Sequence, residues 1–203
     1  LWFGWFGFNG GSALYSNGQA ISAFTVTQIA AAAAGLSWTL TEWILKGKPT
    51  ALGLASGMVA GLVAITPASG FVAPGGALVI GLVAGIACYG AVLLKGVLGY
   101  DDSLDAFGVH GVGGLIGAVL TGVFVSLPLW AYGAEMPEGA FPGKTVVDGT
   151  TVTYDMGAQL GWQIKAVLLA AVYAFVATGV IVLVIDKTIG FTVKAEDETI
   201  GLD

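Results

Sequence analysis

The stretch that decides the fold covers residues 49–94 and reads PTALGLASGMVAGLVAITPASGFVAPGGALVIGLVAGIACYGAVLL, without a charged side chain. One helix needs about 20 apolar residues to cross a bilayer, so this run predicts two crossings joined by a turn. The turn is expected at Thr66-Pro67-Ala68-Ser69-Gly70, a cluster of helix-breaking residue types. Residues 1–41 are equally free of charge and also require two segments. The sequence therefore predicts an all-α polytopic membrane protein.

The overall composition supports this class. Hydrophobic residues make up 56% of the chain and charged residues only 10%, whereas soluble domains carry roughly 25% charged residues. The formal net charge of −6 arises mostly from one loop and the tail, and arginine is absent. No nucleic-acid partner is expected, because arginine is the residue best suited to phosphate recognition.

Helix-breaking clusters divide the chain into roughly five full transmembrane helices plus the end of one. The expected spans, in chain order, are a partial one to about residue 8, then 19–45, 50–65, 77–94, 105–130 and 158–185. A polar segment is expected at 131–157, before the last span. Pairs of glycines four residues apart, such as Gly53 and Gly57, favour close helix packing in lipid.

The beginning of the chain, Leu1-Trp2-Phe3-Gly4-Trp5-Phe6-Gly7-Phe8, has no methionine and no basic region before its apolar residues. It is therefore not typical of a signal peptide, and it is interpreted as the second part of a helix. We expect a fragment, or half of a split polypeptide. Residues 1–190 would form the C-terminal part of a transmembrane domain, and residues 191–203 the start of a cytoplasmic tail.

Lysine placement predicts the orientation, since positively charged loops stay cytoplasmic. Most lysines fall on one side of the expected membrane, and they are Lys46, Lys48, Lys95, Lys187 and Lys194. Lys144 and Lys165 fall on the other side. This pattern predicts a multi-pass protein of the cell membrane with a cytoplasmic C-terminus.

His110 is the only histidine, and no Asp, Glu, Lys or Arg occurs between residues 106 and 134. An ionisable group inside a membrane span is costly and is a functional-site candidate. In one interpretation the imidazole hydrogen-bonds a carbonyl and joins two helices. In the other it lines a path, where it hydrogen-bonds a polar solute or shuttles a proton. Neighbouring glycines favour the second interpretation, because they allow a backbone or small solute to approach the ring.

Aromatic side chains gather near Ser12, at Trp2, Phe3, Trp5, Phe6 and Phe8. Such a cluster is typical of a membrane-interface belt. Alternatively, it forms a cation site, because aromatic faces attract ammonium-type cations by roughly 1–2 kcal/mol when partly dry. In that case the Ser12 hydroxyl would accept a hydrogen bond, and Phe8 would lie between the site and the pore interior.

Other polar groups favour structural roles. Asp101, Asp102 and Asp105 precede the His110 helix, where carboxylates cap free N–H groups, although a cation-attracting mouth is the alternative. Glu42 and Lys46 have the spacing of a surface helix pair. We expect no cofactor, metal site or enzyme activity. There is no second histidine, Cys88 lies on another span, and no carboxylate is spaced to orient His110.

Several motifs, in order and correctly spaced, resemble the Amt/Mep/Rh ammonium transporter family, on its Amt side. They are WFGWFGFNGGS at 2–12, GKP at 47–49, AGLVAITPA at 60–68 and DAFGVHG at 105–111. The resemblance extends to the tail and implies an eleven-helix, inverted-repeat transporter, with one pore in each subunit of a homotrimer embedded in the lipid bilayer. This chain resembles its C-terminal half.

The resemblance also implies roles for single residues. His110 would be one of two pore histidines, Phe8 a gate phenylalanine, Ser12 part of the outer recruitment site, and Trp5 a tryptophan along the pore. The other pore histidine, the second gate phenylalanine and a vestibule tryptophan would belong to the N-terminal half as a partner. Ammonium would be recruited outside, lose a proton near Phe8, and pass His110 as ammonia.

Two other functions remain open at this point. The same fold would serve an ammonium sensor that signals through a cytoplasmic module, either a PII-type partner or a fused domain beyond the tail. A gas channel of Rh type is the second alternative, against which the Amt-like spelling around Trp5 and Phe8 argues.

Overall fold

The computed structural model describes residues 1–125, 144–147, 150–153 and 155–193, and these are nearly all helical. The helices are α1 (Trp2–Gly11), α2 (Gly18–Lys46), α3 (Ala51–Ile65), α4 (Pro74–Leu98), the π-helix η1 (Phe107–Gly111), α5 (Val112–Phe124) and α7 (Met156–Thr188). Strands β1 (Lys144–Val147) and β2 (Thr150–Thr153) pair antiparallel. Two units, Leu1–Gln163 and Ile164–Asp203, are described separately.

The turn between α2 and α3 follows from local sequence. Gly47 ends α2 in the left-handed conformation (φ 77°), which glycine adopts without steric cost. Three residues later, the Thr50 hydroxyl accepts a hydrogen bond from the Gly53 amide at 2.9 Å and caps α3. The Gly47-Lys48-Pro49 sequence therefore reverses the chain between two apolar helices.

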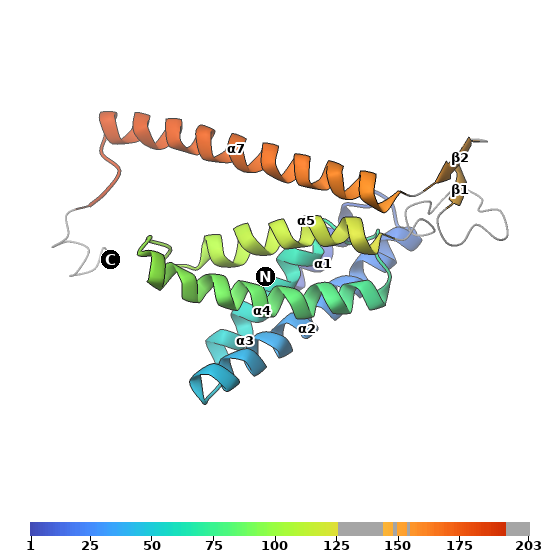
Figure 1. The fold of residues 1–203 in the computed structure, drawn as a ribbon, viewed down its shortest axis with the longest axis horizontal. Helices are drawn as coiled ribbons and strands as arrows, with labels where there is room; N and C mark the ends of the chain where they lie inside the picture. Colours follow the sequence, from blue (N-terminus) through green and yellow to red (C-terminus); the bar gives the residue numbers. More distant parts are fainter. Residues whose placement is uncertain (126–143, 148–149, 154, 194–203) are drawn as a thin grey trace. The chain divides into compact units, whose positions relative to one another are not determined.

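Small residues allow α2, α3 and α4 to pack closely, and each of these helices contacts the other two (Figure 1). A Cβ atom built on Gly57 of α3 would lie 2.9 Å from the Ala34 carbonyl oxygen of α2. A Cβ on Gly81 of α4 would lie 2.9 Å from Cα of Ala30. The alanine-rich middle of α2 is thus enclosed by glycine faces, as expected for helices that associate in lipid. The four-residue glycine spacing was correctly interpreted as packing.

Four helices of the described part are long and apolar enough to cross a membrane: α2, α4, η1 with α5, and α7. The expected third span is present as α3, which has 15 residues. At 1.5 Å per residue it is about 22 Å long, shorter than a hydrocarbon core of about 30 Å. Together with α1 these helices confirm the expected series of apolar segments.

Some helix ends differ from expectation. Helix α1 ends within the predicted helix-breaking cluster, but at Gly11 rather than at about residue 8, because the buried Asn9 side chain bonds Thr27 of α2. The last turn of α4 includes Lys95 and reaches Leu98. Both expected ends were therefore placed too early, since tertiary hydrogen bonds outweigh local helix-breaking preferences here.

The fifth span ends earlier than predicted. Helix α5 stops at Phe124, and Val125 adopts an extended conformation in which it pairs with Val72. The expected continuation to residue 130 was wrong at Val125, and its remainder lies outside the described residues. Within the polar segment 131–157, the β1–β2 hairpin was not predicted.

The second unit contains most of α7, which begins two residues before the expected start and ends three residues after the expected end. Near its end, the exposed Lys187 lies 3.8 Å from Asp186. Such surface ion pairs contribute little to stability. Residues 194–203, which include Lys194 and most of the expected tail, lie outside the described part.

Candidate functional site

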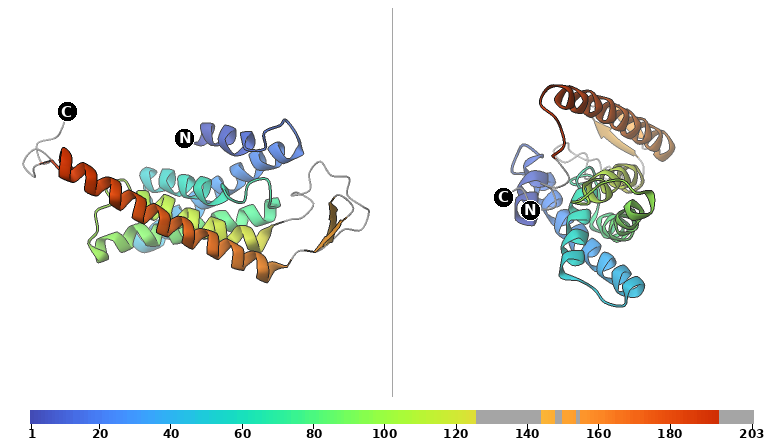
Figure 2. Two further views of the ribbon diagram at one scale, coloured as in Figure 1. Left: turned by 90° about the horizontal axis from the view of Figure 1, so that it is seen from above. Right: turned by 90° about the vertical axis from the view of Figure 1, so that its left-hand side faces the viewer.

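Helix α1 carries Trp5 and Phe8, is followed directly by Ser12, and lies beside the first turns of α2 (Figure 2). The Ser12 hydroxyl donates a hydrogen bond of 2.7 Å to the Phe8 carbonyl oxygen. Its only hydrogen is therefore used, and toward any further partner the Ser12 oxygen acts as an acceptor. Ser12 is exposed, and the Phe8 ring is 60% exposed. This end of α1 can accept a hydrogen bond and present an aromatic surface to the same small ligand.

Trp5 is held in place from both sides. Its indole Nε1 donates a hydrogen bond of 2.8 Å to Oγ1 of Thr66, which in turn donates to the Leu62 carbonyl. The Trp5 and Phe8 rings meet edge to face, with centroids 5.9 Å apart. The Thr66 hydroxyl belongs to the AGLVAITPA motif, so two separate motifs meet at this tryptophan. The orientation of Trp5 is consequently set by α3.

A buried polar chain supports the same part of α1. Asn9 is 2% exposed, and its Nδ2 donates a hydrogen bond of 2.9 Å to Thr27 Oγ1. The Thr27 hydroxyl donates to the Ala23 carbonyl at 2.6 Å. The sequence analysis did not predict this hydrogen bond. The available signal was a polar asparagine directly after Phe8 in an apolar segment. Buried polar groups that find partners restrict how α1 sits on α2.

His110 lies in η1, a single π-helical segment between Asp105 and α5. Turns of this kind are rare and occur frequently at functional sites. The imidazole is exposed, and within the described part of the chain no hydrogen bond or ion pair involves it. Among the described residues, therefore, no hydrogen bond from the imidazole joins two helices.

Contacts of the neighbouring backbone hold η1 in place. The buried Cys88 thiol donates to the Val109 carbonyl oxygen, with sulfur and oxygen 3.8 Å apart. A Cβ atom on Gly108 would lie 2.9 Å from Val92, and one on Gly113 would lie 3.2 Å from Cys88 Sγ. The glycines around His110 thus allow helices α4 and η1–α5 to approach each other. Cys88 is a core residue.

The carboxylates before η1 serve as its cap. Asp102 Oδ2 accepts hydrogen bonds from the amides of Phe107 at 3.0 Å and Gly108 at 3.2 Å. Lys95 of α4 donates to the Asp105 carboxylate and, at 2.7 Å, to the Asp102 carbonyl. The capping interpretation is confirmed for Asp102. The role of Lys95 was missed, because nothing in the local pattern joins it to a loop ten residues later.

The two ends of the candidate site share one apolar cluster. Val109, next to His110, packs with Ala60, Val63 and Cys88, and Trp5 packs against the same group. Phe8 and Ser12 form a separate pair at the end of α1. The structure therefore links Trp5 to the His110 segment through buried side chains of α3 and α4.

Glu42 pairs with Lys46 as its spacing predicted, but it is buried rather than at the interface. It is 4% exposed and accepts hydrogen bonds from the Thr50 amide at 3.0 Å and hydroxyl at 3.1 Å, while Lys46 Nζ lies 3.9 Å away. The carboxylate thus completes the cap of α3. A burial this deep was not visible from the spacing of four, which is typical of solvent-exposed pairs.

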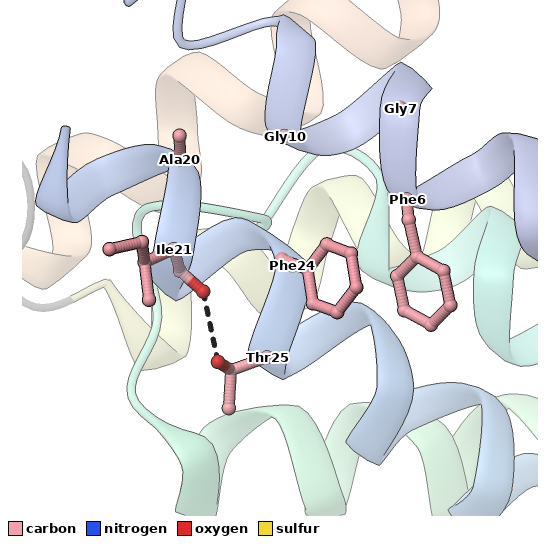
Figure 3. Close-up of a pocket in the computed structure, with 7 residues that line it drawn as sticks. All are labelled: Phe6, Gly7, Gly10, Ala20, Ile21, Phe24 and Thr25. Carbon is pink, nitrogen blue, oxygen red and sulfur yellow. Dashed lines mark hydrogen bonds between the residues drawn. The ribbon is translucent and has the colours of Figure 1, made fainter. Parts of the chain in front are cut away.

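A groove of about 430 Å³ lies between α1 and α2, on the side shown in Figure 3. The Phe6 and Phe24 rings stack there with centroids 4.1 Å apart. Thr25 directs its hydroxyl hydrogen to the Ile21 carbonyl, so the groove surface is largely apolar. No group of three or more potential metal-ligating side chains occurs among the described residues.

Comparison with known proteins agrees with this arrangement. The sequence profile of the Ammonium Transporter Family matches residues 1–203. An ammonium transporter of Bacillus subtilis is 44% identical over 205 residues, covering 100% of this chain and 47% of its own length. The transporter Amt1 of Archaeoglobus fulgidus is 44% identical over 203 residues, again covering 100% of this chain and 47% of its own.

Solved structures match as well. Mep2 of Saccharomyces cerevisiae superposes with a TM-score of 0.82 at 37% identity, covering 97% of this chain and 42% of its own. A structure described as a sensor Amt protein has a TM-score of 0.82 at 32% identity and covers 99% of this chain and 45% of its own. The chain spans about half the length of the curated relatives it matches. With its apolar helices and a match along its whole length, this multi-pass membrane chain belongs to the Ammonium Transporter Family.

Proposed function

We propose that this chain forms the C-terminal half of a pore through which ammonium is carried across the membrane. Family membership supports the substrate class. The observation that supports a pore is the environment of His110. Its imidazole has no described partner, and it lies on an apolar crossing whose backbone is held by Cys88 and Asp102. An ionisable side chain in such a place is favoured where it serves a passing solute.

Recruitment is assigned to the end of α1. Ser12 has its hydrogen committed to the Phe8 carbonyl, so its oxygen accepts from ammonium, which only donates. The adjacent aromatic rings of Phe8 and Trp5 attract the cation through their π faces. Together these contacts replace part of the hydration shell that ammonium loses on entry.

Conduction then requires loss of charge. Carrying an ion through a dry apolar path costs several kcal/mol or more. In the proposed mechanism ammonium transfers a proton near Phe8, and neutral ammonia continues past Trp5 to His110. The imidazole offers a hydrogen bond and, with a second histidine, a route for the proton. Potassium has no proton to lose, so the same path excludes it.

The proposal includes a partner and an assembly. We assign the second histidine and the facing gate to an N-terminal half, with three such pores in a homotrimer surrounded by lipid. Residues 1–190 belong to the transmembrane domain and 191–203 to a tail that begins on the cytoplasmic side, in line with the lysine pattern.

The decisive experiment uses purified complete transporter, both halves included, in liposomes. A current triggered by ammonium but not by potassium supports proton-coupled transport. If neither current nor uptake follows ammonium addition, and binding is also absent, the proposed function is wrong. Empty liposomes provide the control for passive ammonia leakage.

Sensing is the second candidate, and one observation favours it: the fold match to a protein described as a sensor Amt protein covers nearly the whole chain. In this version ammonium binds at Ser12 and the occupancy is passed to a PII-type partner or a fused module beyond the tail. Saturable ammonium binding without any current would select sensing over transport.

A further inference from the structure

A small cavity of about 50 Å³ lies behind Ser12, on a different side of α1 from the apolar groove. Four polar side chains line it, one each from α1, the loop after it, α2 and the loop between α3 and α4, namely Asn9, Ser12, Gln19 and Ser69. Ala13, Ala23 and Phe71 form the apolar part of its wall. Its volume exceeds the roughly 10–15 Å³ that one water molecule requires, and four polar groups match the two to four partners of a buried water.

The two serines act only as acceptors toward this cavity. Ser12 donates its hydroxyl hydrogen to the Phe8 carbonyl at 2.7 Å. Ser69 donates its own to the Thr66 carbonyl at 3.1 Å. Since a hydroxyl has a single hydrogen, each oxygen has only lone pairs left for a further partner.

The orientation of the Asn9 amide follows from the same argument. Thr27 donates its hydrogen to the Ala23 carbonyl, so Thr27 Oγ1 can only accept from Asn9. The NH₂ group of Asn9 must therefore face Thr27, and its carbonyl oxygen remains an acceptor. Gln19 and the second N–H of Asn9 remain as amide donors. The two serine oxygens, which only accept, favour an occupant that donates two hydrogen bonds.

Charge decides which small donor fits. None of the lining residues is charged, and a cavity of about 50 Å³ would strip an ammonium ion of hydration that it keeps at the exposed end of α1. A neutral molecule with two hydrogens is favoured, and water is the most abundant one. We propose that this cavity binds a single water molecule that donates to Ser12 and Ser69 and accepts from the second N–H of Asn9, and that Ser69 is thereby a positioning residue for substrate capture.

This inference rests on the proposed role of Ser12. A hydroxyl oxygen has two lone pairs, and the bridging water donates to one of them while the other faces the substrate. The water also connects the end of α1 to the loop after α3. Both effects hold the Ser12 oxygen in a fixed direction, which lowers the cost of ordering it when ammonium arrives.

The test uses the complete transporter and four variants. Ser69→Ala removes one acceptor, and Ala13→Val fills the cavity from a different residue. Each is expected to raise the half-saturating ammonium concentration about fivefold, the effect of one ordinary hydrogen bond, with the maximal current largely retained. Ser69→Thr keeps the hydroxyl and restores the original value. Thr25→Ala is the matched control, because Thr25 also donates to a helix carbonyl but lines the apolar groove.

A direct readout separates this inference from the proposed function. A structure of the wild-type transporter, at a resolution that shows ordered water, is expected to contain one density peak within hydrogen-bond distance of Asn9 and Ser69. That peak disappears in Ala13→Val. Absence of the peak in the wild type, or unchanged half-saturation in both Ser69→Ala and Ala13→Val, overturns the inference. A peak in protein that neither conducts nor binds ammonium refutes transport and leaves the water site standing.

Discussion

The end of α1 and the η1 segment both carry candidate pore residues, but they hold them in different ways. On α1 the side chains themselves are engaged: Trp5 bonds Thr66, and Ser12 bonds the Phe8 carbonyl. On η1 the contacts reach the backbone around His110, through Asp102 and Cys88, while the imidazole has no described partner. A recruitment site benefits from prearranged groups, whereas an imidazole that exchanges hydrogen bonds with a passing solute needs its nitrogen atoms available.

The largest expected effect comes from His110→Ala in the complete transporter. The ammonium-selective current should fall at least about tenfold, the equivalent of ~1.4 kcal/mol in the barrier, or become leaky to other cations. Current–voltage recordings with ammonium and potassium measure both outcomes. Unchanged current with retained selectivity would remove His110 from the proposed mechanism. The difference between α1 and η1 would then have no consequence for transport.

Phe8→Ala tests the α1 side of the comparison. Removing the ring takes away one aromatic contact to the cation, and the conductance should change by roughly 2- to 10-fold, corresponding to the ~0.5–1.5 kcal/mol of an aromatic contact. The matched control is Phe3→Ala, since Phe3 is 92% exposed on the same helix. Trimer assembly is checked by size-exclusion chromatography, and a variant that fails to assemble would argue for a packing role instead.

Asp102→Ala tests whether η1 is held through its backbone. Loss of the cap should cost about 1 kcal/mol of stability, measured as a lower melting temperature of the purified protein. The maximal ammonium current should fall while the half-saturating concentration, set at α1, stays near the wild-type value. Asp101→Ala provides the control, because Asp101 is the exposed neighbouring carboxylate. Equal effects of both substitutions would show that charge, rather than the cap, matters.

The smallest effect is expected from the bond that orients Trp5. Trp5→Phe and Thr66→Val each remove the 2.8 Å hydrogen bond, and combining them should add little to either alone. The resulting coupling energy should be about 0.5–1 kcal/mol in half-saturation or stability measurements. Strictly additive effects would mean that α3 does not position this tryptophan.

Different parts of the site were accessible to sequence reasoning to different degrees. His110, Phe8, Ser12 and Trp5 were proposed as site residues from residue type and motif, and the Asp102 cap was predicted from its place before a helix. The bonds from Trp5 to Thr66 and from Lys95 to Asp105 were not foreseen. Each of these joins residues on different elements, and no local period encodes such a pairing.

The sequence by itself determined the class of the protein, because long uncharged runs can only be accommodated by helices in a membrane. It also determined the turn at Gly47 and Thr50, where a left-handed glycine and a hydroxyl cap act over a few residues. Only the tertiary structure decided that Asn9 continues α1, that Glu42 is buried, that α5 ends at Phe124, and that His110 lies in a π-turn. The physical reason is that buried polar groups must find partners, and those partners come from other helices.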